Sequence, residues 1–125
     1  MPSKLDTVHQ EFHTEIGSDF FMSMIVGMDG LSISNNAAIE IEGFASEGAA
    51  RMSMIAKLAD KVSTKLGIGK MEDDIVTIDQ GLLILRNLGD GSYFWMIAVP
   101  RTATLGTVRM LMKEFAPKLW DAIPR

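Results

Sequence analysis

Residues 81–99 read GLLILRNLGDGSYFWMIAV, and this stretch decides the fold class. Two β-prone runs, Leu82–Leu88 and Tyr93–Val99, flank the turn dipeptide Asp90-Gly91, so the stretch predicts a β-hairpin. The second run is apolar at nearly every position. An antiparallel strand with one solvated face alternates between apolar and polar residues, so continuous apolarity indicates a sheet that is covered on both faces.

Similar patterns extend the hairpin into a larger sheet. Phe20–Met28 is a second run that is apolar on nearly every residue, and Asp29-Gly30 predicts a tight turn into a return strand at Leu31–Ser34. A further strand is expected at Asp74–Asp79. Because that strand enters directly from a helix, we expect it at an edge of the sheet, where its Ile and Val residues invite pairing with another chain.

Amphipathic patterns predict three helices, at Lys4–Ile16, at Glu42–Leu66 and from Leu105 onward. On the long helix, apolar and small residues occupy about half of the circumference, which exceeds the ~100° stripe that one packing contact requires. Its opposite, polar face is expected to carry Ser53 and several charged residues. We therefore expect the long helix to cover the sheet and also to meet something else.

The fold class that fits these elements is α/β. A three-layer α/β/α domain would place the long helix on one face of a five-stranded, mostly antiparallel sheet and the two terminal helices on the other face. No linker, repeat or low-complexity run interrupts the chain, so residues 1–125 are expected to form a single domain.

Composition excludes several kinds of function. The chain has no cysteine, which excludes disulfides, thiolate zinc sites, iron–sulfur clusters and cysteine nucleophiles. Its net charge of −4 disfavours a nucleic-acid partner, because such binding depends on phosphate neutralisation. No apolar stretch approaches the ~18–20 residues of a membrane-spanning helix, and the first residues are polar, so we expect a cytoplasmic protein without membrane insertion.

Two histidines raise the question of a metal site. His9 and His13 are four residues apart on the first helix, a spacing at which two imidazoles can share one ion. The zinc pattern H-E-x-x-H needs Glu after the first His, however, and Gln10 stands there. No third ligand is evident, so both histidines are interpreted as structural or surface residues.

Two further motifs are weaker still. Gly67–Lys70 superficially resembles a phosphate loop, but it lacks the required flanking residues and follows a helix, so we interpret it as a helix C-cap. Glu72-Asp73-Asp74 could hold a divalent cation, but a solvated acidic turn or a charged guard beside the edge strand is favoured. With no G-x-S-x-G elbow either, no catalytic, cofactor-binding or metal residue is assigned, and we expect no enzyme activity.

The order and spacing of the elements resemble the Roadblock (dynein light-chain type) family over nearly the whole chain. Thr104–Arg109 matches the family's N-L-G-x-x-R start of the last helix, with Thr104 where Asn is common. The other segments that carry the resemblance are Met28–Ser34, Lys65–Gly69, Ile75–Ile78, Gly81–Gly91 and Tyr93–Val99.

The resemblance implies a profilin-like domain that is not an enzyme and has no cofactor. It implies a homodimer, or a heterodimer of paralogues, in which edge strands pair and the long helices lie side by side. This agrees with the wide apolar face of the long helix and with the open edge strand. Arg51 lies on the flank of that apolar face, where it would meet a partner or extend away from it into solvent. The candidate interface residues are Gly48, Arg51, Met52, Ile55, Ala59, Val62, Ile75, Val76 and Thr77.

The family also implies a partner, because its members commonly regulate or scaffold small Ras-like GTPases. The resemblance is closest to the bacterial MglB-like regulators, which accelerate hydrolysis by a partner GTPase without inserting an arginine finger. The first hypothesis is thus a dimeric, non-enzymatic regulator of a small Ras-like GTPase. The alternative is a nucleotide-independent scaffold or adaptor subunit, in the style of dynein light chains or lysosomal scaffolds. A third hypothesis is a small-ligand sensor or minor enzyme, since related three-layer sheets can enclose pockets.

Overall fold

The computed structural model describes residues 3–17, 20–38 and 47–124. Its helices and strands follow the predicted order, and Leu66 ends the long helix as predicted, whereas the predicted start of that helix at Glu42 lies outside the described residues. The elements are α1 (Lys4–Ile16), β1 (Met22–Gly27), β2 (Ser32–Ala37), α2 (Ala49–Leu66), β3 (Asp73–Ile78), β4 (Gly81–Leu88), β5 (Tyr93–Pro100) and α3 (Leu105–Ala122).

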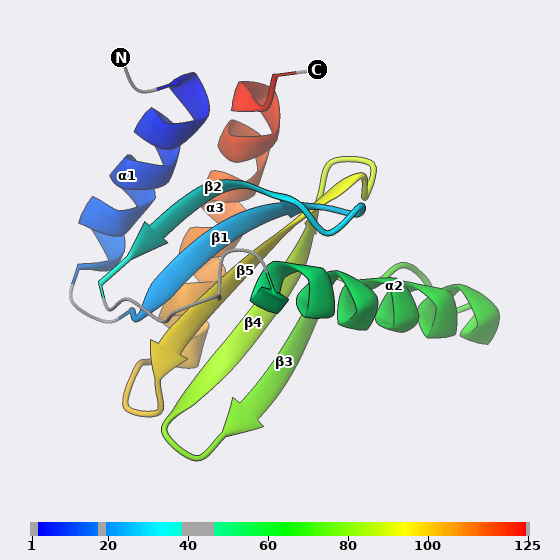
Figure 1. Ribbon diagram of the computed structural model, residues 1–125. Helices are drawn as coiled ribbons and strands as arrows, with labels where there is room; N and C mark the ends of the chain where they lie inside the picture. The colour runs from blue at the N-terminus through cyan, green and yellow to red at the C-terminus, as the bar shows by residue number, and fades with distance from the viewer. Residues whose placement is uncertain (1–2, 18–19, 39–46, 125) are drawn as a thin grey trace.

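The strands form one sheet in the order β2-β1-β5-β4-β3, and every pairing between neighbours is antiparallel. β3 therefore lies at an edge, as predicted. α1 and α3 lie side by side on one face of the sheet, and α2 crosses the other face (Figure 1). The predicted three-layer α/β/α arrangement is confirmed.

Each face of the sheet carries its own hydrophobic core. Ile25, Trp95 and Ile97 belong to the cluster beneath α1 and α3, whereas Met24 and Met96 belong to the cluster beneath α2. Successive residues of a strand point to opposite faces, so nearly every position of β1 and β5 is apolar, and Ser23 of β1 is a buried polar exception. All of Phe94–Val99 is buried, which explains the unbroken apolar run in the sequence.

The face of α2 that packs against the sheet differs from the face that the sequence predicts. Ser53 was expected on the polar face, but it is 4% exposed and lies against the sheet side together with Ala49 and Ala56. Small residues face inward because α2 passes close to the β1–β2 turn, where a Cβ on Gly30 would lie 3.3 Å from the Cα of Ala50. Met52 and Ile55 pack beside these small residues, whereas four other large apolar residues of α2 point away from the sheet: Met54, Leu58, Val62 and Leu66.

Candidate functional site

A row of large apolar side chains on α2 is exposed to solvent. Met54, Leu58, Val62 and Leu66 are 69%, 64%, 51% and 65% exposed. They follow one another at intervals of four residues, so they form a continuous strip along one side of the helix, which we call the apolar ridge. In Figure 1 the C-terminal half of α2 extends beyond the sheet, and three ridge residues belong to that half.

The interface residues predicted on α2 lie beside this ridge, and one of them belongs to it. Met52 and Ile55 are half-buried and pack against the cluster beneath α2. Gly48 and Ala59 are also half-buried, and Val62 is the member of the ridge. The sequence-based set thus did not include Met54, Leu58 and Leu66, although their spacing of four residues is visible in the sequence.

Arg51 and β3 complete the predicted interface set. The Arg51 side chain is 73% exposed and lies 3.1 Å from Glu47 in an ion pair. On β3, Val76 is paired with Leu83, which packs beneath α2, so Val76 faces the α2 side. Ile75 and Thr77 alternate with it and face the α1 and α3 side. The structure therefore brings Val76, but not its two neighbours, to the sheet face that α2 covers in part.

A row of lysines runs along α2 beside the apolar ridge, on the side away from Met52 and Ile55. Lys57, Lys61 and Lys65 are exposed and again four residues apart, and we call them the lysine row. Two of them, Lys57 and Lys61, line a hollow of about 410 Å³ whose opposite wall contains Met28 and Gly91 from the turns at the end of the sheet.

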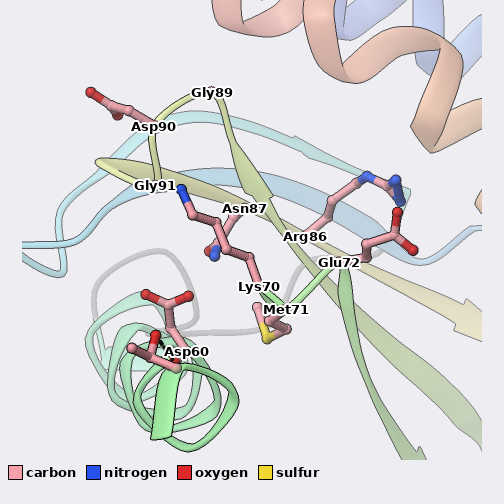
Figure 2. Close-up of a pocket in the computed structure, with 10 residues that line it drawn as sticks. Asp60, Lys70, Met71, Glu72, Arg86, Asn87, Gly89, Asp90 and Gly91 are labelled. Carbon is pink, nitrogen blue, oxygen red and sulfur yellow. Dashed lines mark hydrogen bonds between the residues drawn. The ribbon is translucent and has the colours of Figure 1, made fainter. Parts of the chain in front are cut away.

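A second, polar hollow of about 260 Å³ shares Asp60 and Gly91 with the first, and the residues that line it are drawn in Figure 2. The Asp60 carboxylate rises into it from α2, and the Lys70 side chain extends across it toward the β4–β5 turn (Figure 2). The Thr64 hydroxyl donates to the Asp60 carbonyl at 2.9 Å, so it is engaged within the helix. Asn87 Oδ1 is buried without a hydrogen-bond partner among the described residues. Neither these residues nor the rest of the described chain bring together three metal-ligating side chains.

Asp73 anchors the edge strand instead of belonging to a solvated acidic turn, which corrects the sequence interpretation. Its side chain is 4% exposed, and its carboxylate lies 2.8 Å from both Arg86 and Arg109. Arg109 is the last residue of the Thr104–Arg109 segment, so this conspicuous motif ties α3 to β3. Gly67 does end α2 in the left-handed conformation, as the C-cap interpretation predicted.

His9 is a structural residue of the core. It is 1% exposed, and its two ring nitrogens lie 2.6 Å from Ser23 Oγ and 2.9 Å from Ser34 Oγ. Burial lowers the pKa of His9 from 6.5 to about 4, although the nearby Asp6 carboxylate opposes that change. A hydrogen bond from Ser34 lowers the pKa of Asp6. His9 is therefore neutral near pH 7 and has no lone pair available for a metal ion.

Comparisons with known proteins give a fold but no sequence relative. No family model and no curated protein sequence matches the chain. Myxococcus xanthus MglB is similar in structure with a TM-score of 0.84 at 14% identity, covering 94% of this chain and 93% of that one. A Roadblock/LC7 domain from Streptomyces avermitilis has a TM-score of 0.80 at 17% identity, covering 91% and 92%.

Profilins are a more distant structural match. A chain in the crystal structure of the LokiProfilin1–rabbit actin complex has a TM-score of 0.66 at 19% identity and covers 98% of both chains. No helix in the described ranges is both long and apolar enough to cross a membrane. The chain has the profilin-like α/β/α fold found in MglB and in Roadblock/LC7 domains.

Proposed function

We propose that the chain self-associates through α2 and β3, and that the resulting dimer binds a small Ras-like GTPase and modulates its nucleotide hydrolysis or nucleotide state. The observation that carries this proposal is the apolar ridge of α2, which its own sheet leaves exposed. Fold similarity to MglB and to Roadblock/LC7 domains supports it.

Burial of the exposed ridge side chains can supply the free energy for self-association. Complete burial of one Leu, Val or Met side chain stabilises by about 1.5–3 kcal/mol, and each ridge residue has half or more of that gain still available. A symmetric dimer would bury two ridges, so the gain can offset the loss of translational and rotational freedom on association, about 4–15 kcal/mol. The exposed edge of β3 offers backbone groups for pairing in the same assembly.

Regulation of a GTPase needs no catalytic residue on this chain. A regulator can act by binding one arrangement of the GTPase switch loops more tightly than the others, which shifts the population toward that arrangement. The proposal therefore assigns no reacting group to the chain, including the residues of the polar hollow.

Affinity capture from native lysate tests the proposal, once with a nonhydrolysable GTP analogue and once with GDP. We expect a Ras-like GTPase to be retained mainly with the analogue, and its single-turnover hydrolysis rate to change when the chain is added. Equal retention with both nucleotides would instead indicate the scaffold or adaptor alternative. Retention of no GTPase in either state, together with an unchanged rate, would refute the proposal.

A further inference from the structure

Positive charge is concentrated on α2 and the loop that follows it. Residues 51–70 carry Arg51 and four lysines against one acid, Asp60, for a net charge of +4. Since the whole chain has a net charge of −4, all other residues together carry −8. An acidic molecule thus presents one strongly basic segment on its surface.

The basic side chains are positioned for contact with another molecule. Lys57, Lys61, Lys65 and Lys70 are all exposed, and within the described ranges none of them has an ion-pair partner. Like charges at a spacing of four residues destabilise a helix slightly, so the lysine row is not explained by the stability of α2. The Arg86 and Arg109 side chains, in contrast, are engaged with Asp73.

The lysine row and the apolar ridge occupy neighbouring strips of one helix. Each lysine immediately precedes a ridge residue in sequence, as Lys57 precedes Leu58 and Lys61 precedes Val62. The row also borders the hollow of about 410 Å³, which Lys57 and Lys61 line together with Asp60, Met28 and Gly91. A ligand lying along this flank would meet two cations and one carboxylate on the helix, and an apolar side chain, Met28, across the hollow.

We propose that the lysine row is the docking surface for an acidic protein surface that also presents apolar side chains, and that this surface belongs to the GTPase. The inference rests on the proposed function for the identity of the partner. An anionic membrane is the poorer fit, because a helix lying in a membrane surface inserts an apolar face opposite its basic face, and the face of α2 opposite the lysine row packs against the protein's own sheet. On α2 one side of the ridge is basic, and the other side turns toward the protein's own sheet.

A peptide-binding experiment tests the surface without requiring a GTPase. The probe is a fluorescein-labelled peptide of glutamates with interspersed leucines, and fluorescence anisotropy gives its affinity. The variant Lys57→Ala/Lys61→Ala/Lys65→Ala keeps good helix formers on α2. The matched control, Lys4→Ala/Lys113→Ala/Lys118→Ala, removes the same charge from exposed positions on α1 and α3.

We expect the lysine-row variant to bind the peptide about tenfold more weakly and the control to bind within about twofold of the unmodified chain. Raising the salt from ~50 to ~200 mM should weaken binding to the unmodified chain, since screening shortens the range of charge–charge attraction. The inference is overturned if both variants lose affinity equally, or if the unmodified chain does not bind the peptide. Sedimentation with phosphatidylserine vesicles without peptide binding would overturn it in favour of a membrane.

The same variants separate this inference from the proposed function. If the capture experiment retains a GTPase and the lysine-row variant retains it equally well, the inference fails and the proposed function stands. If no GTPase is captured but peptide binding requires the lysine row, the proposed function fails, and the row remains a docking surface for an acidic partner of another kind.

Discussion

His9 Nε2 lies 2.6 Å from Ser23 Oγ in the core, and the Trp95 indole N–H donates to the same hydroxyl oxygen at 2.7 Å. On the other side of the ring, the Ser34 hydroxyl donates its hydrogen to Asp6 Oδ1 at 2.7 Å, so Ser34 Oγ can only accept from His9 Nδ1. Nδ1 therefore carries the ring hydrogen, and Nε2 accepts the hydrogen of the Ser23 hydroxyl. A neutral His9 thus completes a chain of four hydrogen bonds in which every donor has an acceptor.

The buried His9 makes stability depend on pH. Its pKa is about 4 in the folded chain and 6.5 at its ordinary value, so the unfolded chain binds a proton first as pH falls. The contribution of neutral His9 to the free energy of unfolding is therefore fully present above pH 6.5. It is lost between pH 6.5 and pH 4, by about 3 kcal/mol in total. Urea unfolding at several pH values measures this decline.

Two histidine variants check the assignment of that decline. His9→Gln removes the titrating group but keeps a donor and an acceptor, so its unfolding free energy should vary much less between pH 6.5 and pH 4. His13→Gln should keep the decline. The lowered pKa of Asp6 changes the free energy of unfolding only below the ordinary Asp6 value of 3.8, which is outside the range from pH 6.5 to pH 4. An equal decline in His9→Gln would contradict the prediction.

Ser23→Ala should destabilise the fold strongly, because it removes the partner of two buried groups at once. The Trp95 N–H and His9 Nε2 would both lose a hydrogen bond inside the core. Each unsatisfied buried group costs about 1–3 kcal/mol, so we expect a loss of about 2–6 kcal/mol in the free energy of unfolding. Ser32→Ala is the control, since the Ser32 hydroxyl donates its hydrogen bond to the Asn35 side-chain oxygen at an exposed position. Similar losses in both variants would count against the buried chain of hydrogen bonds.

The fold could be predicted from the sequence because its strongest signals are local. The turns at Asp29-Gly30 and Asp90-Gly91 determine which strands form hairpins, and the almost continuous apolar runs of β1 and β5 require a layer on each face of the sheet. The edge position of β3 followed from its direct entry from α2. These inferences need no knowledge of which distant side chains meet.

The features that could not be predicted depend on contacts between distant segments. In the sequence Asp73 stands in a run of three acidic residues, and only the fold brings Arg86 and Arg109 beside it. Ser53 faces inward because α2 passes close to Gly30, and periodicity alone gives no information on that approach. The rotation of α2 that results is what leaves the apolar ridge exposed.

Asp73→Ala should cost about 3 kcal/mol of unfolding free energy, because it leaves the largely buried Arg86 guanidinium without its carboxylate. It also releases Arg109, which connects α3 to β3. Asp74→Ala, one residue later and without an ion pair in the described structure, should change stability by less than about 1 kcal/mol. Chemical denaturation of both variants measures the difference, and equal losses would show that the cluster does not anchor β3.

Gly89→Ala should destabilise more than Gly91→Ala, although both glycines have positive φ, +55° and +89°. A Cβ on Gly89 would overlap the Trp120 ring, whereas a Cβ on Gly91 would meet no atom within 4 Å. We expect about 1–2 kcal/mol for Gly91→Ala from its backbone conformation, and at least about 1–3 kcal/mol more for Gly89→Ala. Thermal unfolding compares them, and equal melting temperatures would contradict close packing of Trp120 on this turn.

Leu58→Glu should convert a dimer into a folded monomer, because it places a charge in the middle of the apolar ridge. Met110→Glu is the matched control, since Met110 on α3 is 64% exposed, as Leu58 is. Light scattering after size exclusion should give a dimer for the unmodified chain and for Met110→Glu, and a monomer for Leu58→Glu. Both side chains are already largely in solvent, so circular dichroism should show all three proteins folded. A dimer that survives Leu58→Glu would place the interface elsewhere, and an unmodified chain that is monomeric would remove self-association from the proposal.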